Sequence, residues 1–125
     1  PVIGEYFPTG HADMNPRDLH ETVRAGSRIV AELGADCIKT FNTCDFHAVT
    51  GTCPVPILGL GAERLPTQIE ALMLAASEIT NGAGGVVFGR NAIQVPDPFA
   101  FQAALCEVVR DNADPEAMVE RYGLK

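Results

Sequence analysis

Lys39 is the residue whose type and setting most directly suggest chemistry. The chain has only two lysines, Lys39 and the last residue, Lys125. Lys39 lies in the mostly apolar run 37–41, near the C-terminal end of a predicted strand. Apolar neighbours exclude water from an amine, which favours its neutral form, and a neutral lysine can attack a carbonyl carbon to form an imine. The sequence therefore offers Lys39 as an imine-forming nucleophile. The alternative is a strand-end lysine whose ammonium group reaches solvent.

Two glycine-bearing segments could bind phosphate. Residues 59–64 read Gly-Leu-Gly-Ala-Glu-Arg, and residues 85–91 read Gly-Val-Val-Phe-Gly-Arg-Asn. Each belongs to the end of a predicted strand, where small residues let backbone N–H groups approach a phosphate and a following helix points its N-terminus there. The alternative is ordinary turn geometry, because every junction between strand and helix needs flexible residues. The candidate phosphate-binding residues are Gly61, Ala62, Gly89 and Arg90.

The loop after the first predicted strand holds a third set of candidates, His11 and Asp13. A histidine can move protons near neutral pH. The alternative is a solvated loop that ends in a helix cap. Elsewhere, His20 and Glu78 fall on predicted helices, where we expect them at the surface, and His47 follows the Lys39 strand and could face the site or solvent.

The elements that must position these residues alternate along the chain. Short apolar runs bounded by Gly and Pro predict strands over residues 2–7, 35–41, 54–60 and 84–88. Apolar residues at helical spacing predict helices over residues 18–33, 66–81 and 97–110, with a last short helix after Asp114-Pro115. Asn15 is expected to cap the first of these helices, and Gly34 and Gly82 are expected to end the first and the second. Only about two turns of helix fit between the second and third strands. The alternation implies a parallel sheet with right-handed crossovers.

Two α/β architectures fit four strand–helix units. One is a small doubly wound sheet, and the other is half of a (β/α)₈ barrel, which needs about 250 residues in total. The first predicted strand begins at once, at residue 2, which favours the half-barrel. Catalytic groups of barrels lie at the C-terminal ends of the strands. Lys39 and the three candidate segments follow such ends, so we expect them at one end of the sheet.

Composition narrows the classes of partner. The chain has a net charge of −7 and no cluster of Lys and Arg, so neither nucleic acid nor a membrane surface is an expected partner. No apolar run approaches the roughly 18 residues of a membrane-spanning helix. The four cysteines form no Cys-x-x-Cys pair, which indicates reduced, buried side chains rather than metal ligands or disulfides. We therefore expect a cytoplasmic protein.

Three segments of the chain resemble the archaeal-type class I fructose-bisphosphate aldolases. Residues 31–40, 53–58 and 84–94 are similar to that family's Schiff-base strand, its seventh strand, and its eighth strand with the phosphate loop. Relatives of the family include the aminodideoxyheptulosonate synthases and the phospho-autoinducer aldolase (thiolase) enzymes. The Gly-Arg-Asn-x-x-Gln stretch is the most specific motif, whereas the Lys-Thr strand also resembles deoxyribose-phosphate aldolase. The resemblance spans nearly the whole chain.

The resemblance implies a fold and a reaction. Residues 1–125 would be the C-terminal half, strands 5 to 8, of a single TIM-barrel aldolase domain. Lys39 would be the Schiff-base lysine of a class I aldolase, a carbon–carbon lyase that acts on a phosphorylated keto compound without a cofactor or metal. Its partner would be an N-terminal half-barrel from the same or a separate chain, within a homo-oligomer. Two alternatives stay open: a thiolase-like acyl transferase of the autoinducer branch, and a non-catalytic half-barrel that binds a phosphorylated ligand.

The sequence departs from the family pattern at two places. The aldolases and synthases end their fifth strand with Tyr-Pro-Arg-Gly, in which the tyrosine is the acid/base, whereas this chain has Phe-Pro-Thr-Gly at residues 7–10. Their seventh strand is followed by Gly-Gly, where this chain has Gly61-Ala62. The phosphate loop is expected to be retained. The proton-transfer step needs another group, because the Phe7 side chain has no acidic proton to donate.

We expect Glu5 or His11 to replace the tyrosine. Alternate strand residues point to opposite faces, so Glu5 shares the face of Phe7 while Tyr6 points toward the helices. A carboxylate near the lysine could act as a base. Glu5 is preferred because a strand holds it more rigidly than a loop holds His11. The alternative is that Glu5 only pairs electrostatically with Lys39.

Overall fold

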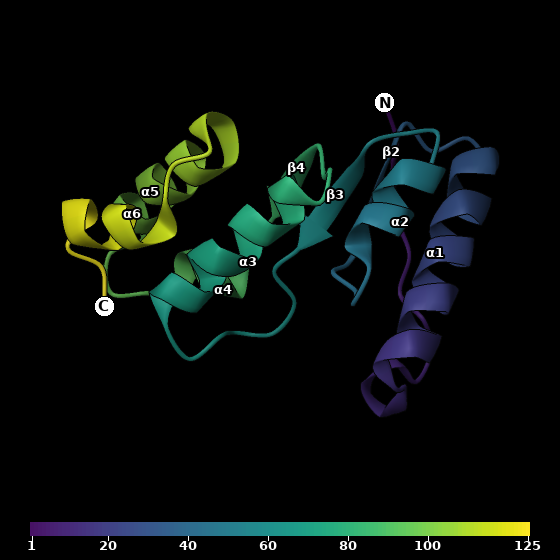
Figure 1. The fold of residues 1–125 in the computed structure, drawn as a ribbon, viewed down its shortest axis with the longest axis horizontal. Helices are drawn as coiled ribbons and strands as arrows, with labels where there is room; N and C mark the ends of the chain where they lie inside the picture. Colours follow the sequence, from purple (N-terminus) through teal and green to yellow (C-terminus); the bar gives the residue numbers. More distant parts are fainter.

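The computed structural model describes residues 1–125. The predicted alternation of strands and helices is confirmed, and a short 3₁₀ helix (His11–Asp13) follows the first strand. None of the helices combines the length and apolar character needed to cross a membrane. Along the chain (Figure 1) the elements are β1 (Ile3–Glu5), α1 (Pro16–Glu32), β2 (Cys37–Phe41), α2 (Phe46–Thr52), β3 (Ile57–Leu60), α3 (Gln68–Thr80), β4 (Gly85–Val87), α4 (Arg90–Ile93), α5 (Pro98–Asp111) and α6 (Pro115–Tyr122).

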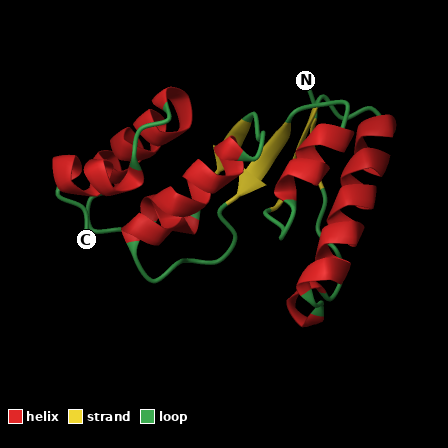
Figure 2. Cartoon of the chain, in the orientation of Figure 1, coloured by secondary structure: helices red, strands yellow, loops and turns green.

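The four strands form one parallel sheet in the order β1-β2-β3-β4. A doubly wound sheet has to reverse its strand order at a switch point, and that reversal places helices on both faces. Here the order runs in one direction, so right-handed crossovers place α1, α2 and α3 on the same face. Figure 2 shows the strands of the sheet together with the helices α1, α2 and α3 that lie beside them. The doubly wound alternative is therefore wrong, and the fold is that of a half-barrel.

The helix ends follow from local side-chain and backbone chemistry. The Asn15 side chain accepts hydrogen bonds from two backbone N–H groups at the start of α1, and Pro16 takes the first helical position. The glycines predicted to stop α1 and α3, Gly34 and Gly82, have the positive φ angles of 107° and 93° that favour glycine after a helix. Thr67 and Glu70 form a reciprocal capping box at the start of α3.

Apolar side chains fill the layer between the sheet and the helices. One buried cluster joins strand residues Ile38 and Ile57 to Val23 of α1 and to two residues of α2, Phe46 and Val49. A second cluster joins α3 to the C-terminal helices, which pack beside it (Figure 1). Its most buried members are Leu72, Ala75, Phe101, Ala104 and Val108.

Alternation along the strands gives the sheet two different faces. Ile38, Thr40 and Ile57 are buried under the helices. Their neighbours Lys39 and Leu58 point to the other face, which no helix of this chain covers, and are half-buried. This helix-free face corresponds to the interior of a barrel.

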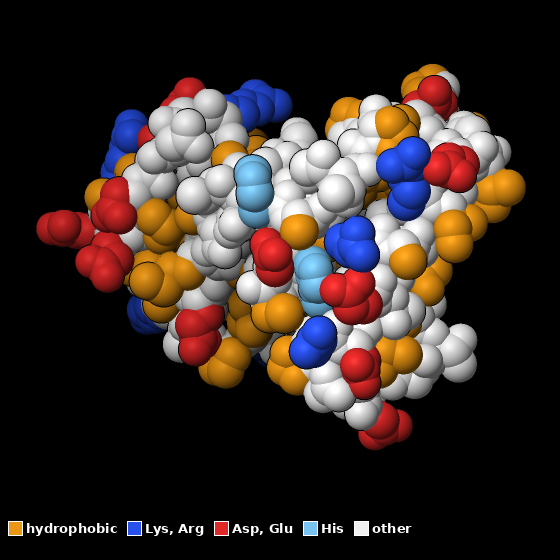
Figure 3. All heavy atoms as spheres, turned by 45° about the vertical axis from the view of Figure 1, so that its right-hand side comes forward, with side chains coloured by type: hydrophobic (Ala, Val, Ile, Leu, Met, Phe, Trp, Pro, Cys, Tyr) orange, Lys and Arg blue, Asp and Glu red, His pale blue; other side chains and the backbone are white.

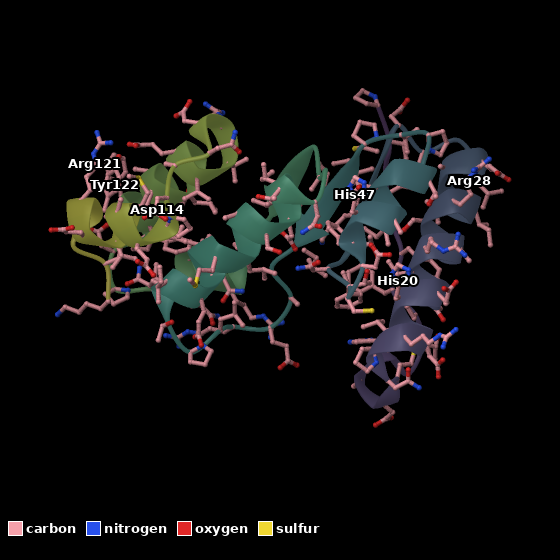
Figure 4. All side chains as sticks on the ribbon, in the orientation of Figure 1. His20, Arg28, His47, Asp114, Arg121 and Tyr122 are labelled. Atoms are coloured by element: carbon pink, nitrogen blue, oxygen red, sulfur yellow. The ribbon has the colours of Figure 1, made fainter.

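Two helix residues that we expected at the surface are buried, so that expectation is wrong. His20 is 7% exposed, and its Nδ1 lies 3.0 Å from the Thr43 hydroxyl. Figure 4 shows His20 on α1, and the loop that carries Thr43 precedes the short helix α2. Glu78 is 0% exposed, because its carboxyl group lies against Gly59 of β3, where no side chain competes for the space.

The outer surface carries charges of both signs. On the face seen in Figure 3, Lys and Arg side chains are interspersed with Asp and Glu and do not gather in one patch. Two short-range ion pairs along α1, between Arg24 and Glu21 and between Arg28 and Glu32, belong to this pattern.

Candidate active site

Lys39 is the central residue of β2 and lies on the helix-free face of the sheet, two residues before the strand ends. Its direct partners in the ladders are Glu5 of β1 and Leu58 of β3. The Lys39 side chain is 20% exposed. In a parallel barrel, a side chain at this position points into the end of the barrel where catalytic groups gather.

Glu5 reaches Lys39 directly. The Lys39 ammonium donates a hydrogen bond to Glu5 Oε1 over 2.6 Å. The predicted faces are confirmed, because the Phe7 ring centre lies 5.7 Å from Lys39 Nζ and the Tyr6 ring lies against Gly26 of α1 on the opposite face. The pairing of Glu5 with Lys39 is thus present, while a proton-shuttle role for Glu5 stays a prediction.

A hollow of about 420 Å³ opens above Lys39 at the C-terminal ends of the strands. The expected convergence of the β1, β2, β3 and β4 loops at one end of the sheet is therefore found. Four of the candidate residues, Lys39, His11, Ala62 and Arg90, border this one space. The full lining is Phe7, His11, Lys39, Phe41, Leu60, Ala62, Glu63 and Arg90.

His11 enters the hollow from the 3₁₀ helix after β1. Its ring packs against Phe41 with 4.7 Å between ring centres, and its Nδ1 lies 3.3 Å from the Pro8 carbonyl oxygen. Asp13 is not part of the lining. His47 is exposed on α2, outside the hollow (Figure 4). Of the candidate histidines, His11 is the one placed to exchange protons with a molecule bound near Lys39.

The loops after β3 and β4 are tied together beside the hollow. Arg90 Nη2 donates to the Ala62 carbonyl oxygen over 3.1 Å. Asn91, which sequence reasoning did not single out, is buried and bonds three backbone groups of residues 61–65. The sequence pointed to Asn91 only through its place in the Gly-Arg-Asn motif.

The expected phosphate cradle needs one correction. The Gly61 N–H group donates to the Val87 carbonyl oxygen over 3.3 Å, which continues the β3–β4 ladder by one residue. This amide is therefore engaged and does not face a ligand. Ala62 has a φ of 50°, a left-handed conformation that glycine adopts freely. The alanine that replaces the family's second glycine thus retains a glycine-like backbone.

A second, mostly apolar hollow of about 450 Å³ adjoins the first. It opens between α1, α3 and the loop that precedes α2, and it shares Phe41, Leu60 and Ala62 with the Lys39 hollow. It contains no Lys, Arg, His, Asp or Glu side chain. Acid–base and charge chemistry is therefore concentrated in the Lys39 hollow. No group of three or more His, Cys, Asp or Glu side chains in the chain is arranged to hold a metal ion.

Comparison with known proteins gives two sets of relatives. No protein-family model matches the chain. The 3-hydroxy-5-phosphonooxypentane-2,4-dione thiolase of Enterobacter sp. (strain 638) is 44% identical over 87 residues, which are 69% of this chain and 29% of that protein. The thiolase of the same name from Salmonella paratyphi A is 40% identical over 97 residues, which are 77% of this chain and 33% of that protein. The chain thus spans about a third of the length of these curated relatives.

The solved structures agree with the fold. An archaeal fructose-1,6-bisphosphate aldolase, whose catalytic lysine is covalently bound to a carbinolamine intermediate of the substrate, superposes with a TM-score of 0.76 at 32% identity. The superposition covers 87% of this chain and 45% of the aldolase. A match over less than half of a barrel is what four strands of an eight-stranded barrel should give. By sequence and by fold, the chain is similar to the archaeal-type class I fructose-bisphosphate aldolases and the 3-hydroxy-5-phosphonooxypentane-2,4-dione thiolases, and it corresponds to half of the aldolase barrel.

Proposed function

We propose that the protein containing this chain is an enzyme, a class I aldolase-type lyase that forms an imine between Lys39 and a phosphorylated keto compound. The observation that carries the proposal is the position of Lys39 on the helix-free face, at the mouth of a hollow that it shares with His11 and Arg90. The archaeal aldolase that binds its substrate covalently through a lysine supports the same chemistry. Both sets of relatives are named for phosphorylated carbonyl compounds.

The reaction begins with the removal of a proton from the Lys39 ammonium, and Glu5 is in contact to accept it. The neutral amine then attacks the carbonyl carbon, and the carbonyl oxygen takes a proton to give a carbinolamine. Loss of water leaves an iminium ion. A base then takes the proton of the hydroxyl group on the β carbon, and the bond between the α and β carbons breaks. The hydroxyl oxygen becomes the carbonyl oxygen of the released aldehyde, and the electron pair of the broken bond moves toward the iminium nitrogen, which gives an enamine. Proton return to the enamine carbon and hydrolysis of the imine free Lys39.

Proton transfer to and from the substrate needs a group other than Phe7. Glu5 and His11 are the two titratable side chains near Lys39 on β1 and its loop. We assign the role to one of them and prefer Glu5, because it is already hydrogen-bonded to Lys39.

Arg90 and the backbone around Ala62 and Gly89 would hold the phosphate group. Arg90 is the second basic side chain that lines the hollow, beside Lys39. An arginine can hold phosphate through two parallel hydrogen bonds. The Gly61 amide takes no part in this assignment, because Val87 already accepts its hydrogen bond.

A thiolase-like acyl transferase is the second candidate. The curated relatives carry a thiolase name, and the chain is 44% identical to one of them. This reading keeps Lys39 and needs no tyrosine at position 7. A half-barrel that binds a phosphorylated ligand without turnover is the non-enzymatic alternative.

The rest of the barrel completes the proposal. Ile3, on the helix-free face, is exposed. β1 and β4 are the outer strands of the sheet, so each has one edge without a neighbouring strand. We propose that an N-terminal half-barrel, from the same or a separate chain, covers this face, and that the whole protein is a homo-oligomer. We place it in the cytoplasm, since its four cysteines are all unpaired.

Borohydride trapping tests the proposal. The full-length protein would be incubated with fructose 1,6-bisphosphate or with 3-hydroxy-5-phosphonooxypentane-2,4-dione and then reduced. A stable adduct should appear on the peptide that contains Lys39. Lys39→Ala and Lys39→Arg should abolish it, because a guanidinium group stays protonated. Lys125→Arg is the matched control and should retain it. An adduct that persists in Lys39→Ala would overturn the assignment. A lyase should release a cleavage product without a thiol acceptor, whereas an acyl transferase should need the thiol.

A further inference from the structure

Asn91 is a buried, hydrogen-bonded side chain that lies behind the lining of the hollow. It lies in α4, directly after Arg90, and is 3% exposed. Its Nδ2 group donates to the carbonyl oxygens of Gly61, over 2.6 Å, and Glu63, over 2.9 Å. Its Oδ1 accepts from the Leu65 N–H group over 2.7 Å. Both hydrogens and the oxygen of one amide are therefore used on a single loop, residues 61–65.

This arrangement requires an amide of this size. A carboxylate at position 91 could accept from Leu65 but would have no hydrogen to donate to the two carbonyl groups. An alanine would leave all three backbone groups in a buried place without a partner, which is costly. The bonds also cross 26 to 30 residues of sequence, so they join the β3 loop to the β4 loop.

The segment that Asn91 holds contains a backbone conformation that an L-residue rarely adopts. Ala62, with its φ of 50°, lies between the two residues whose carbonyl groups Asn91 binds. The Ala62 carbonyl oxygen is itself held by Arg90. A left-handed alanine is less favourable than a right-handed one, so surrounding contacts must hold it in place. Asn91 and Arg90 supply those contacts from one short helix.

We propose that Asn91 is a positioning residue that fixes the loop 61–65 in the shape that receives the phosphate group of the substrate. Asn91 itself is buried and does not touch the hollow, whereas Ala62, Glu63 and Arg90 line it. The residue therefore sets specificity for phosphorylated over unphosphorylated keto compounds and leaves imine formation at Lys39 unaffected. This inference rests on the proposed function.

The experiment compares two small ketones, dihydroxyacetone phosphate and dihydroxyacetone. Borohydride trapping on the Lys39 peptide of the full-length protein gives a half-saturating concentration for each ketone. Asn91→Asp and Asn91→Ser should raise that concentration for the phosphate ester about tenfold or more, the loss expected when one or two hydrogen bonds no longer hold the loop. The value for dihydroxyacetone should stay within about twofold of the wild type. Its retention also reports that the variant is folded.

The matched control is Asn81→Ala. Asn81 also donates from its amide to a backbone carbonyl oxygen, that of Ser77 at the end of α3, but it lies away from the hollow. It should leave both half-saturating concentrations unchanged. Equal weakening of both ketones by the Asn91 variants, or no weakening of either, would overturn the inference. A wild-type protein that traps neither ketone would instead overturn the proposed function.

Hydrogen exchange on the wild-type protein tests the same idea without a substitution. Inorganic phosphate should slow amide exchange over residues 62–65 and 89–91, because a bound anion would hold both loops. Phosphate that leaves exchange in these two segments unchanged would overturn the assignment of the loop as the phosphate receiver.

Discussion

The carboxyl group of Glu78 occupies the space that a side chain on Gly59 would fill. Glu78 projects from α3 onto the helix-covered face of β3, and it is 0% exposed. Neither of its carboxyl oxygens has a hydrogen-bond partner. Burial of this kind disfavours the charged form and raises the pKa of Glu78 to about 8. The folded protein therefore carries a neutral carboxylic acid between sheet and helix at neutral pH.

The first prediction concerns the pH dependence of stability. Between the ordinary pKa of 4.5 and the folded value of about 8, the unfolded chain loses this proton and the folded chain keeps it. The stabilisation is thus complete below pH 4.5, and the free energy of unfolding falls as pH rises toward 8, by at most about 1.4 kcal/mol per pH unit. Urea unfolding of the full-length protein from pH 5 to 9 should show this slope, and Glu78→Gln should flatten it. The control is Glu120→Gln, at an exposed position on α6, which should leave the slope unchanged. If Glu78→Gln also left the slope unchanged, the prediction would be contradicted.

The second prediction concerns the space that Glu78 and Gly59 share. Gly59→Ala adds a methyl group that overlaps the Glu78 carboxyl group, so it should lower the free energy of unfolding by about 1–3 kcal/mol. In the double variant with Glu78→Ala, the methyl group gains room. The two changes together should therefore destabilise less than the sum of the single changes, a coupling that a double-mutant cycle measures. The control is Gly51→Ala, on α2 with open space around it, which should leave the free energy of unfolding unchanged or raise it. If the changes in the free energy of unfolding at positions 59 and 78 were strictly additive, the packing argument would be refuted.

The third prediction separates the two candidates for the proton shuttle. Glu5→Gln keeps the shape of the side chain but cannot accept a proton from Lys39. It should reduce kcat by about 10²-fold or more, while a keto substrate is still trapped on Lys39 by borohydride. His11→Ala should have a smaller effect, because its ring lies in the loop and packs on Phe41. Normal turnover in both variants would exclude both residues and leave Glu63, which also lines the hollow, or a group in the other half of the barrel.

The fourth prediction concerns the left-handed alanine. Ala62→Gly should leave both stability and trapping of phosphorylated ketones close to wild type, because glycine adopts this backbone freely. Ala62→Val should lower the free energy of unfolding by roughly 1–2 kcal/mol, because a branched side chain adds to the cost of the left-handed conformation. Thermal unfolding of the three proteins in parallel provides the comparison. A valine variant as stable as the glycine variant would show that the loop does not hold this conformation in solution.

The fifth prediction concerns the isolated chain. Residues 1–125 alone leave the helix-free face uncovered, with Ile3 and Phe7 among the exposed apolar side chains. They also leave both outer strands of the sheet, β1 and β4, without a neighbour on one side. Such edges and faces drive association, so sedimentation velocity should show oligomers or aggregates. A single monomeric species that unfolds cooperatively would count against the half-barrel assignment of this face.

Features that depend on neighbouring residues could be predicted from the sequence. The Asn15 cap and the glycine stops of α1 and α3 are local, and the structure has them where they were expected. The opposite orientations of Tyr6 and Phe7 follow from strand geometry alone. The strands themselves came out shorter than predicted, because an apolar run continues beyond the residues that form ladder hydrogen bonds.

Features that depend on distant residues could not be predicted. Glu78 is buried because position 59, on another element, has no side chain. His20 is buried because the loop before α2 brings Thr43 against α1. Asn91 binds a loop 26 to 30 residues earlier in the chain, and nothing in its immediate sequence reveals those partners.

The consecutive order of the strands also bears on how the protein is made. Each strand of the sheet pairs with the strand that precedes it in the chain, so no ladder has to wait for a segment from far downstream. A ribosome adds roughly 5–20 residues per second, so β2 can dock on β1 within seconds of leaving the exit tunnel, followed by β3 and then β4. Assembly can therefore proceed vectorially, one strand–helix unit at a time, during synthesis.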